Sequence, residues 1–121
     1  MTQKNNMLNA IRKLDNNSKR LMYYLNDSIK YDKRYVEDYL IFNIDRFCEI
    51  CDLPKENGIK EAKKLLIDLY SQDEFIALNG KNSKLILWYE VNSTLRKVAI
   101  RLDAGLIDSI KKEPIKFILD V

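Results

Sequence analysis

One continuous stretch, residues 40–103, constrains the fold more than any other part of the chain, because its apolar residues change their spacing several times. Residues 40–44 are apolar and favour a β-strand. Residues 45–51 predict a helix of about two turns with its first residue, an aspartate, as the N-cap. Residues 52–58 are rich in turn formers. Over residues 59–70, apolar side chains recur at helical spacing, which predicts a second, amphipathic helix.

A β-hairpin and a further strand are expected after these helices. Residues 74–78 and 84–91 flank a five-residue loop that contains glycine, residues 79–83, and this pattern favours a hairpin. Residues 97–102 alternate between apolar and polar, as a half-buried strand does. A strand, two helices across a tight turn and a hairpin follow one another in a winged helix-turn-helix. We therefore expect an α+β fold of this kind, with the hairpin around residues 79–83 as its wing.

The N-terminal part of the chain adds helices to this motif. At 121 residues with 46% hydrophobic content, residues 1–121 are expected to form a single domain. Residues 1–6 are predicted to be a disordered arm, followed by a short amphipathic helix over residues 7–14 that could serve in interactions. Asn17 or Ser18 is the expected N-cap of the next helix.

The C-terminal part predicts one helix and one strand. Asp103 is expected to cap a helix that ends before Pro114. Residues 115–121 alternate as a strand with one apolar face, and an unpaired strand would expose that face and a row of backbone groups. We expect this strand to pair with a second copy, which gives a homodimer on a repeated or palindromic site; pairing within its own sheet is the alternative.

The distribution of charge favours a nucleic-acid ligand. The net charge is +3, but residues 1–34 carry eight basic against three acidic residues, and residues 81–101 carry five against one. Residues 55–80 carry four against five. Clustered Lys and Arg neutralise phosphates and release counterions. We therefore expect the wing to contribute at least as much DNA affinity as the second helix. The alternative is that these charges are ordinary solvated surface.

The expected DNA contacts come from three places. The second helix would present its side chains to the major groove, and the hairpin loop would meet an adjacent groove or the phosphates. The residues are Asn57, Lys60, Lys63 and Lys64 at the second helix, Lys81, Asn82 and Lys84 at the hairpin loop, and Arg96, Lys97 and Arg101 at the last strand of the motif.

Catalysis is not expected, and no cofactor is implied. Histidine is absent, which removes the usual general base, and the three glycines are isolated, so no phosphate-cradling loop exists. The carboxylates Asp27, Asp32, Glu37 and Asp38 are best explained as solvated surface. The sequence shows no signal peptide and no apolar stretch near the roughly 20 residues that span a bilayer. We expect a cytoplasmic protein.

The only two cysteines, Cys48 and Cys51, have the C-x-x-C spacing. Two thiols cannot complete a tetrahedral zinc site, which needs four ligands, unless two subunits share it. We expect both to be buried, structural and free of metal.

Exposed aromatic side chains could stack on the bases of a single strand. The candidates are Tyr23, Tyr24, Tyr31, Tyr35, Trp88 and Tyr89. Because apolar residues occupy both faces of residues 84–91, we expect that strand to be central, with Trp88 in the core rather than on a base.

A family resemblance rests on four segments in order: Ser18–Leu25 (SKRLMYYL), Ile44–Leu53 (IDRFCEICDL), Ile59–Leu66 (IKEAKKLL) and Lys97–Leu102 (KVAIRL). Together they resemble the N-terminal winged-helix domain of iteron-plasmid replication initiator proteins, over about residues 18–113. The resemblance implies dimerisation and contacts with DNA phosphates, while a second domain of the initiators reads the iteron.

The sequence ends at Val121 with no such second domain, so we expect a small DNA-binding protein of a plasmid or phage. It would act in replication, partition, conjugation or repression, with proteins of those processes as partners. The leading interpretation is a non-enzymatic, dimeric binder of double-stranded DNA. The alternative is a protein-interaction module that keeps the fold without binding DNA, because the helix over residues 59–70 mixes both signs of charge.

Overall fold

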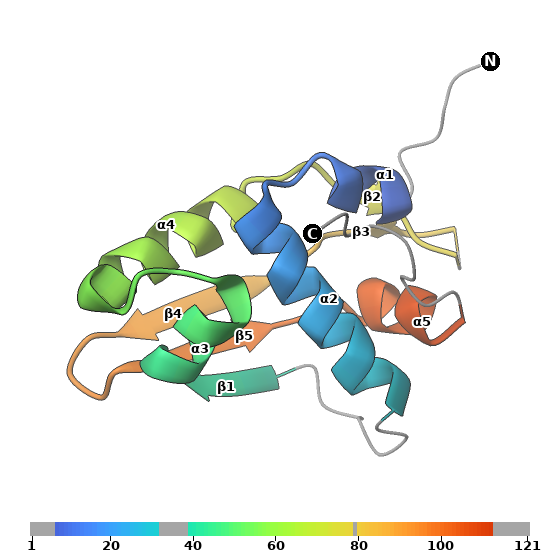
Figure 1. Ribbon diagram of the computed structural model, residues 1–121. Coiled ribbons are helices and arrows are strands. Elements are labelled where there is room, and N and C mark those ends of the chain that lie inside the picture. Colours follow the sequence, from blue (N-terminus) through green and yellow to red (C-terminus); the bar gives the residue numbers. More distant parts are fainter. Residues whose placement is uncertain (1–6, 32–38, 79, 113–121) are drawn as a thin grey trace.

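The computed structural model describes residues 7–31, 39–78 and 80–112 (Figure 1). Helices and strands alternate irregularly, as in an α+β domain. In chain order they are α1 (Met7–Arg12), α2 (Asn16–Tyr31), β1 (Tyr39–Asn43), α3 (Ile44–Cys51), the 3-10 helix η1 (Lys55–Asn57), α4 (Gly58–Tyr70), β2 (Phe75–Ile76), β3 (Asn82–Ser83), β4 (Trp88–Asn92), β5 (Lys97–Arg101) and α5 (Ala104–Lys112).

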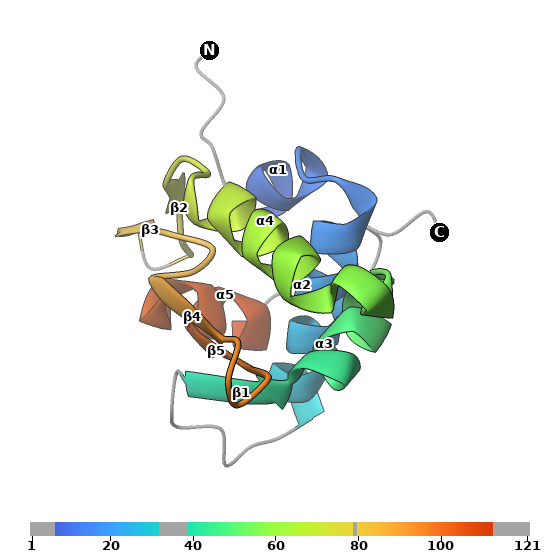
Figure 2. The ribbon, with the colours of Figure 1, turned by 90° about the vertical axis from the view of Figure 1, so that its left-hand side faces the viewer.

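Three antiparallel strands form the main sheet, in the order β1-β5-β4. Val98 and Ile100 on the central strand are buried, whereas their neighbours Lys97 and Arg101 are exposed. Since side chains alternate along a strand, one face of the sheet belongs to the core and the other faces outward. Helix α3 packs against β1 and β5, and α4 packs against β4. Figure 2 shows α2, α3 and α4 to one side of the three strands.

Helix α2 contacts α1, α3, α4 and α5, and its apolar stripe faces the core between them. Leu21, Met22 and Leu25 are almost fully buried in one core with residues of α3 and α4. Helix α1 also packs into this core, because Met7 and Ile11 are buried. The short N-terminal helix is therefore confirmed as a helix, and one of its faces belongs to the core of the domain.

Both expected N-caps of the helices before the turn are wrong by a few residues. At the start of α2 the capping side chain is that of Asp15, which accepts the Ser18 N–H at 2.8 Å. Asn17 and Ser18 lie inside the helix. Asn17 instead donates its amide to the Cys51 carbonyl at 2.7 Å, which ties α2 to the end of α3. Asn43 caps α3 by accepting the Arg46 N–H at 2.8 Å, so Asp45 lies in the first turn of the helix.

The expected wing hairpin is also wrong. β2 and β3 pair over only two residues each and form a separate small sheet. After β3 the chain turns away, because Asp103 accepts the Lys84 N–H at 2.8 Å. The hairpin that forms the wing is β4–β5, with its turn at residues 93–96. The expected strand over residues 84–91 is thus shortened and displaced to Trp88–Asn92.

This displacement changes the environment of Trp88. β4 lies at the edge of the sheet rather than in its centre, and the Trp88 side chain is 39% exposed. The expectation that Trp88 belongs to the core is therefore wrong. The strand over residues 97–102 is confirmed, with Leu102 buried just after it.

The last helix is confirmed as well. Asp103 accepts the Gly105 N–H at 2.9 Å, and Leu106 and Ile110 are buried. Residues 1–6, the connection over residues 35–38 and the expected strand over residues 115–121 lie outside the described residues. The dimer that rests on that strand stays a prediction. Within the described ranges, no helix is both long and apolar enough to cross a bilayer.

Candidate nucleic-acid interface

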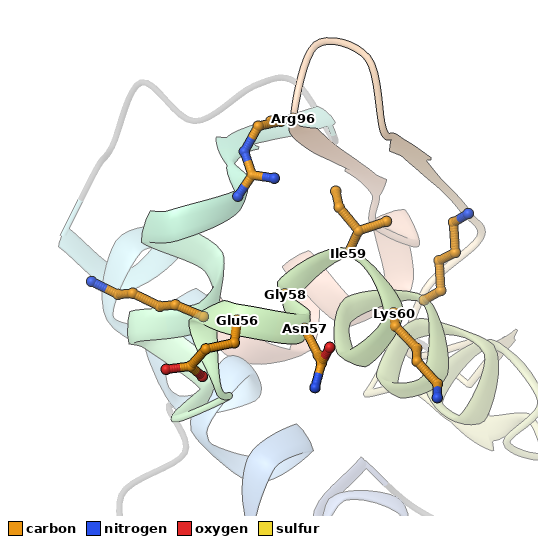
Figure 3. Close-up of a pocket in the computed structure, with 8 residues that line it drawn as sticks. Glu56, Asn57, Gly58, Ile59, Lys60 and Arg96 are labelled. Atoms are coloured by element: carbon orange, nitrogen blue, oxygen red, sulfur yellow. The ribbon is translucent and has the colours of Figure 1, made fainter.

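The start of α4 and the turn of the wing border one hollow of about 420 Å³. We call it the basic hollow, because four cationic side chains line it and only one carboxylate does. Its lining residues are Lys55, Glu56, Asn57, Gly58, Ile59, Lys60, Lys63 and Arg96. In Figure 3, Arg96 extends into the hollow from the wing turn, and Asn57 and Lys60 lie along its opposite border.

Local packing fixes the start of α4. Gly58 is buried, and a Cβ at this position would lie only 3.1 Å from the Cys48 Sγ, so the first turn of α4 sits close against α3. Lys60 and Lys63 are three residues apart and therefore neighbours on the helix surface, and both are exposed. Asn57 precedes the helix without a cap bond from its side chain. The amide of Asn57 is thus not used to cap α4.

Arg96 brings a charge to the same hollow from a distant part of the sequence. Its backbone has a φ of 52°, in the left-handed region. Its carbonyl accepts the Ile44 N–H at 2.9 Å, which anchors the wing turn to the start of α3. The guanidinium lies 3.6 Å from an Asp45 carboxylate oxygen, and both side chains are more than half exposed. Such an exposed pair is weak, so Arg96 can exchange Asp45 for a phosphate.

Lys55 also lines the hollow and was not among the contacts expected from the sequence. Its Nζ lies 3.2 Å from Glu49, which also pairs with Arg46 at 3.4 Å. The hydrogen bond from Lys55, and then its charge, lower the pKa of Glu49. Lys55 lies closer to its carboxylate, at 3.2 Å, than Arg96 does to Asp45, at 3.6 Å, so Arg96 exchanges its partner for an added anion more readily.

The remaining expected contact of α4, Lys64, faces elsewhere. It lines a second hollow of about 110 Å³ together with three carboxylates, Asp15, Glu61 and Asp68. Local acidic charge there opposes the approach of a polyanion. The structure thus brings Asn57, Lys60, Lys63 and Arg96 from the expected set to one hollow, whereas Lys64, on the same helix, lines the second, more acidic hollow.

The expected loop contacts lie near the other end of α4. Lys81 and Asn82 are exposed at the β2–β3 turn, which follows the C-terminal end of that helix. The Lys84 Nζ lies 3.9 Å from the centroid of the Tyr70 ring, in the last turn of α4. A helix of 13 residues is about 20 Å long, so these groups are well separated from the basic hollow. Lys97 and Arg101 project from the outer face of the sheet instead.

Both cysteines are buried, as expected, and neither forms a disulfide. The described part of the chain contains no group of three or more His, Cys, Asp or Glu side chains that could hold a metal ion. Burial raises the pKa of Cys51 from 9.0 to about 12, with the neighbouring Cys48 and Asp15 adding to the effect. Burial, and then the charge of Asp45, also raises the pKa of Cys48.

We expect these buried thiols to make stability fall at alkaline pH. The unfolded chain loses the Cys51 proton above about pH 9, whereas the folded protein holds it to about pH 12. The contribution is therefore fully present below pH 9, and the free energy of unfolding then falls by about 1 kcal/mol per pH unit. Urea unfolding of the wild type and of Cys51→Ala across this window measures it. Parallel pH profiles for the two proteins would contradict it.

The architecture defines the class of the protein. β1 leads into α3 and α4, which are joined by a short turn, and the β4–β5 hairpin packs its first strand against α4. This is a winged helix-turn-helix protein, which confirms the expected fold class. The family model "Initiator Replication protein, WH1" matches residues 1–113, so the chain belongs to this family and is a replication-related winged-helix protein.

A solved structure supports the fold. The crystal structure of the MSBI1.176 WH1 domain, a replication protein isolated from a multiple sclerosis patient, is similar to this chain with a TM-score of 0.58 and 12% identity. The match covers 93% of this chain and 95% of that one. No curated protein matches the chain.

Proposed function

We propose that this protein binds double-stranded DNA through the basic hollow. The observation that carries the proposal is the convergence of Lys60 and Lys63 from α4 with Arg96 from the wing turn around one depression. In winged helix-turn-helix proteins, the second helix of the motif and the wing are the two parts that approach a duplex. Convergence of their charges at one place suits a sugar–phosphate backbone that passes between them.

The surroundings of the hollow favour an anion. Helix α4, which has 13 residues, begins at Gly58 on the border of the hollow, so the partial positive charge of its N-terminus lies there. Phosphate contacts of this kind set position and affinity, whereas base contacts set sequence preference. The side-chain amide of Asn57 lines the hollow, makes no capping hydrogen bond to α4, and can both donate and accept hydrogen bonds. We assign it to a contact with a base edge or a phosphate.

The family and the site together indicate a role in the maintenance of a plasmid or phage replicon. Replication is the process that the family name supports. Partition, conjugation and repression of the replicon are related roles that need the same duplex contact. The proposed role is non-enzymatic and cytoplasmic, and a homodimer would present two hollows to a repeated site.

Selection of bound sequences from a random duplex library tests this function. We expect enrichment of a repeated or palindromic motif and binding that weakens steeply with salt. The absence of any enriched duplex, together with salt-independent capture of a partner protein, would instead support a protein-interaction module.

A further inference from the structure

Helix α4 exposes one large aliphatic side chain on the face that points away from the core. Ala62, Leu65 and Leu69 are buried and lie roughly opposite Ile67 around the helix. Ile67 is 53% exposed and is not among the residues that line the basic hollow. Isoleucine is also a weaker helix former than unbranched residues. Neither packing nor helix stability therefore favours isoleucine at this position.

The neighbours of Ile67 on this exposed face are cationic. Lys60, Lys63 and Lys64 are exposed and precede it by seven, four and three residues. The four side chains thus follow the i, i+3, i+4, i+7 spacing of one helix face. Recognition helices that lie along the major groove, such as that of the homeodomain, read bases with side chains of this same spacing. Cations around one apolar group suit a groove in which phosphates border the base edges.

We propose that Ile67 contacts the 5-methyl group of a thymine, which makes a T·A pair part of the duplex site. Thymine is the base that presents an apolar group, this methyl, in the major groove. An aliphatic side chain buries against the methyl, whereas a lysine gains little from it. The lysines then supply affinity through phosphates, and Ile67 supplies sequence preference. This inference rests on the proposed binding of duplex DNA.

The helix presents Ile67 rigidly. An isoleucine in a helix has one strongly preferred rotamer, so the side chain loses little freedom on contact. The Ser71 hydroxyl donates to the Ile67 carbonyl at 2.7 Å, which secures the backbone at this turn. Lys60, which lines the basic hollow, lies about 10 Å away along the helix, or about three base-pair steps. The thymine should therefore lie about three base pairs from the phosphates at the hollow.

Charge favours DNA over a second copy of the chain as the occupant of this face. A two-fold contact through Ile67 would bring the three lysines of one copy close to the three of the other. A duplex instead supplies the anions that these lysines need.

Replacement of thymine by uracil removes the methyl group and keeps every hydrogen-bonding group of the base, so it tests the contact directly. One duplex has about 20 base pairs of alternating adenine and thymine, and the other has uracil in place of every thymine. In anisotropy titrations, the wild type should bind the uracil duplex about fivefold more weakly, as expected for the loss of one buried methyl. Ile67→Ala should bind both duplexes with the same, weaker affinity.

Two further variants serve as controls. Ile67→Val keeps a branched aliphatic side chain and should retain most of the preference for thymine. Ile41→Ala makes the same truncation as Ile67→Ala on strand β1, at a residue that is 67% exposed. It should keep the full preference for thymine, because the contact belongs to α4.

The outcomes separate this inference from the proposed function. Equal affinity of the wild type for the two duplexes would overturn the inference alone. The same loss on the uracil duplex in the wild type and in Ile67→Ala would also overturn it, because the methyl would then act through DNA shape. Self-association that Ile67→Ala abolishes, without any preference for thymine, would place a second copy on this face and overturn it too. A wild type that binds neither duplex, nor any duplex of the random library, would refute the proposed function and this inference with it.

Discussion

Replacement of Lys60, Lys63 and Arg96 by glutamine should reduce the affinity for duplex DNA on the order of 100-fold at moderate salt. Each side chain lines the basic hollow, and each would lose one charge-assisted contact with a phosphate. The loss should be similar for every duplex sequence, because phosphate contacts carry no base information. Anisotropy titrations of labelled duplexes measure it.

A matched variant removes the same charge elsewhere. Lys64, Lys81 and Lys84 were expected from the sequence to contact DNA, but they are not among the residues that line the hollow. Their replacement by glutamine should cost no more than a few-fold in affinity, through the general field of the protein. Equal losses for the two triple variants would show that net charge, and not the hollow, determines binding.

The substitution Gly105→Ala should destabilise the folded protein by about 1–3 kcal/mol, as overpacking of a tight contact does. A Cβ at this position would overlap the Ser83 hydroxyl and lie 3.0 Å from the Ser83 Cβ and 3.3 Å from the Ala77 Cβ. Both Gly105 and Ser83 are buried, so neither side can move into solvent. Thermal unfolding followed by circular dichroism should show a melting temperature lower by about 5 °C or more.

Ser83 offers the control for this clash. Ser83→Gly alone should be mildly destabilising, because glycine in a strand gains freedom on unfolding. Added to Gly105→Ala, it should recover part of the lost stability, since it removes the overlapping hydroxyl and the nearer Cβ. Strictly additive effects of the two substitutions would mean that the contact does not limit the packing of α5 on β3.

The helices were predictable because their signals are local. The periodic apolar residues of α3, α4 and α5 mark one buried face each, and the structure has these helices within a residue or two of the expected ranges. Their caps were less predictable. Asn43 and Asp45 are two positions apart, and both residue types are good N-caps. Asn43 is the N-cap because α3 begins directly at the end of β1.

The wing could not be located from local signals, because two turns compete. Residues 79–83 look like a hairpin loop, and so do residues 92–94. Contacts distant in sequence settle the outcome: Asp103 takes the Lys84 N–H, and Gly105 admits Ser83 against α5. The exposure of Trp88 follows from the same event, since sheet order, and not the composition of β4, makes that strand an edge.

Three of the four cations that line the basic hollow were expected, but not their convergence. Lys60 and Lys63 share a helix, whereas Arg96 is more than thirty residues away in the sequence and joins them only because the wing turn is anchored to the start of α3. Lys55 was not expected, because it lies in the turn before α4, where no helical spacing shows which side chains share a face.

The salt dependence of duplex binding tests the central claim most directly, because it counts neutralised phosphates. We expect the slope of log affinity against log salt concentration to be shallower in the triple variant with Lys60→Gln, Lys63→Gln and Arg96→Gln than in the wild type. The difference should correspond to about three phosphate contacts, each of which contributes about 0.9 to the slope. A triple variant whose slope equals that of the wild type would show that DNA does not occupy the basic hollow.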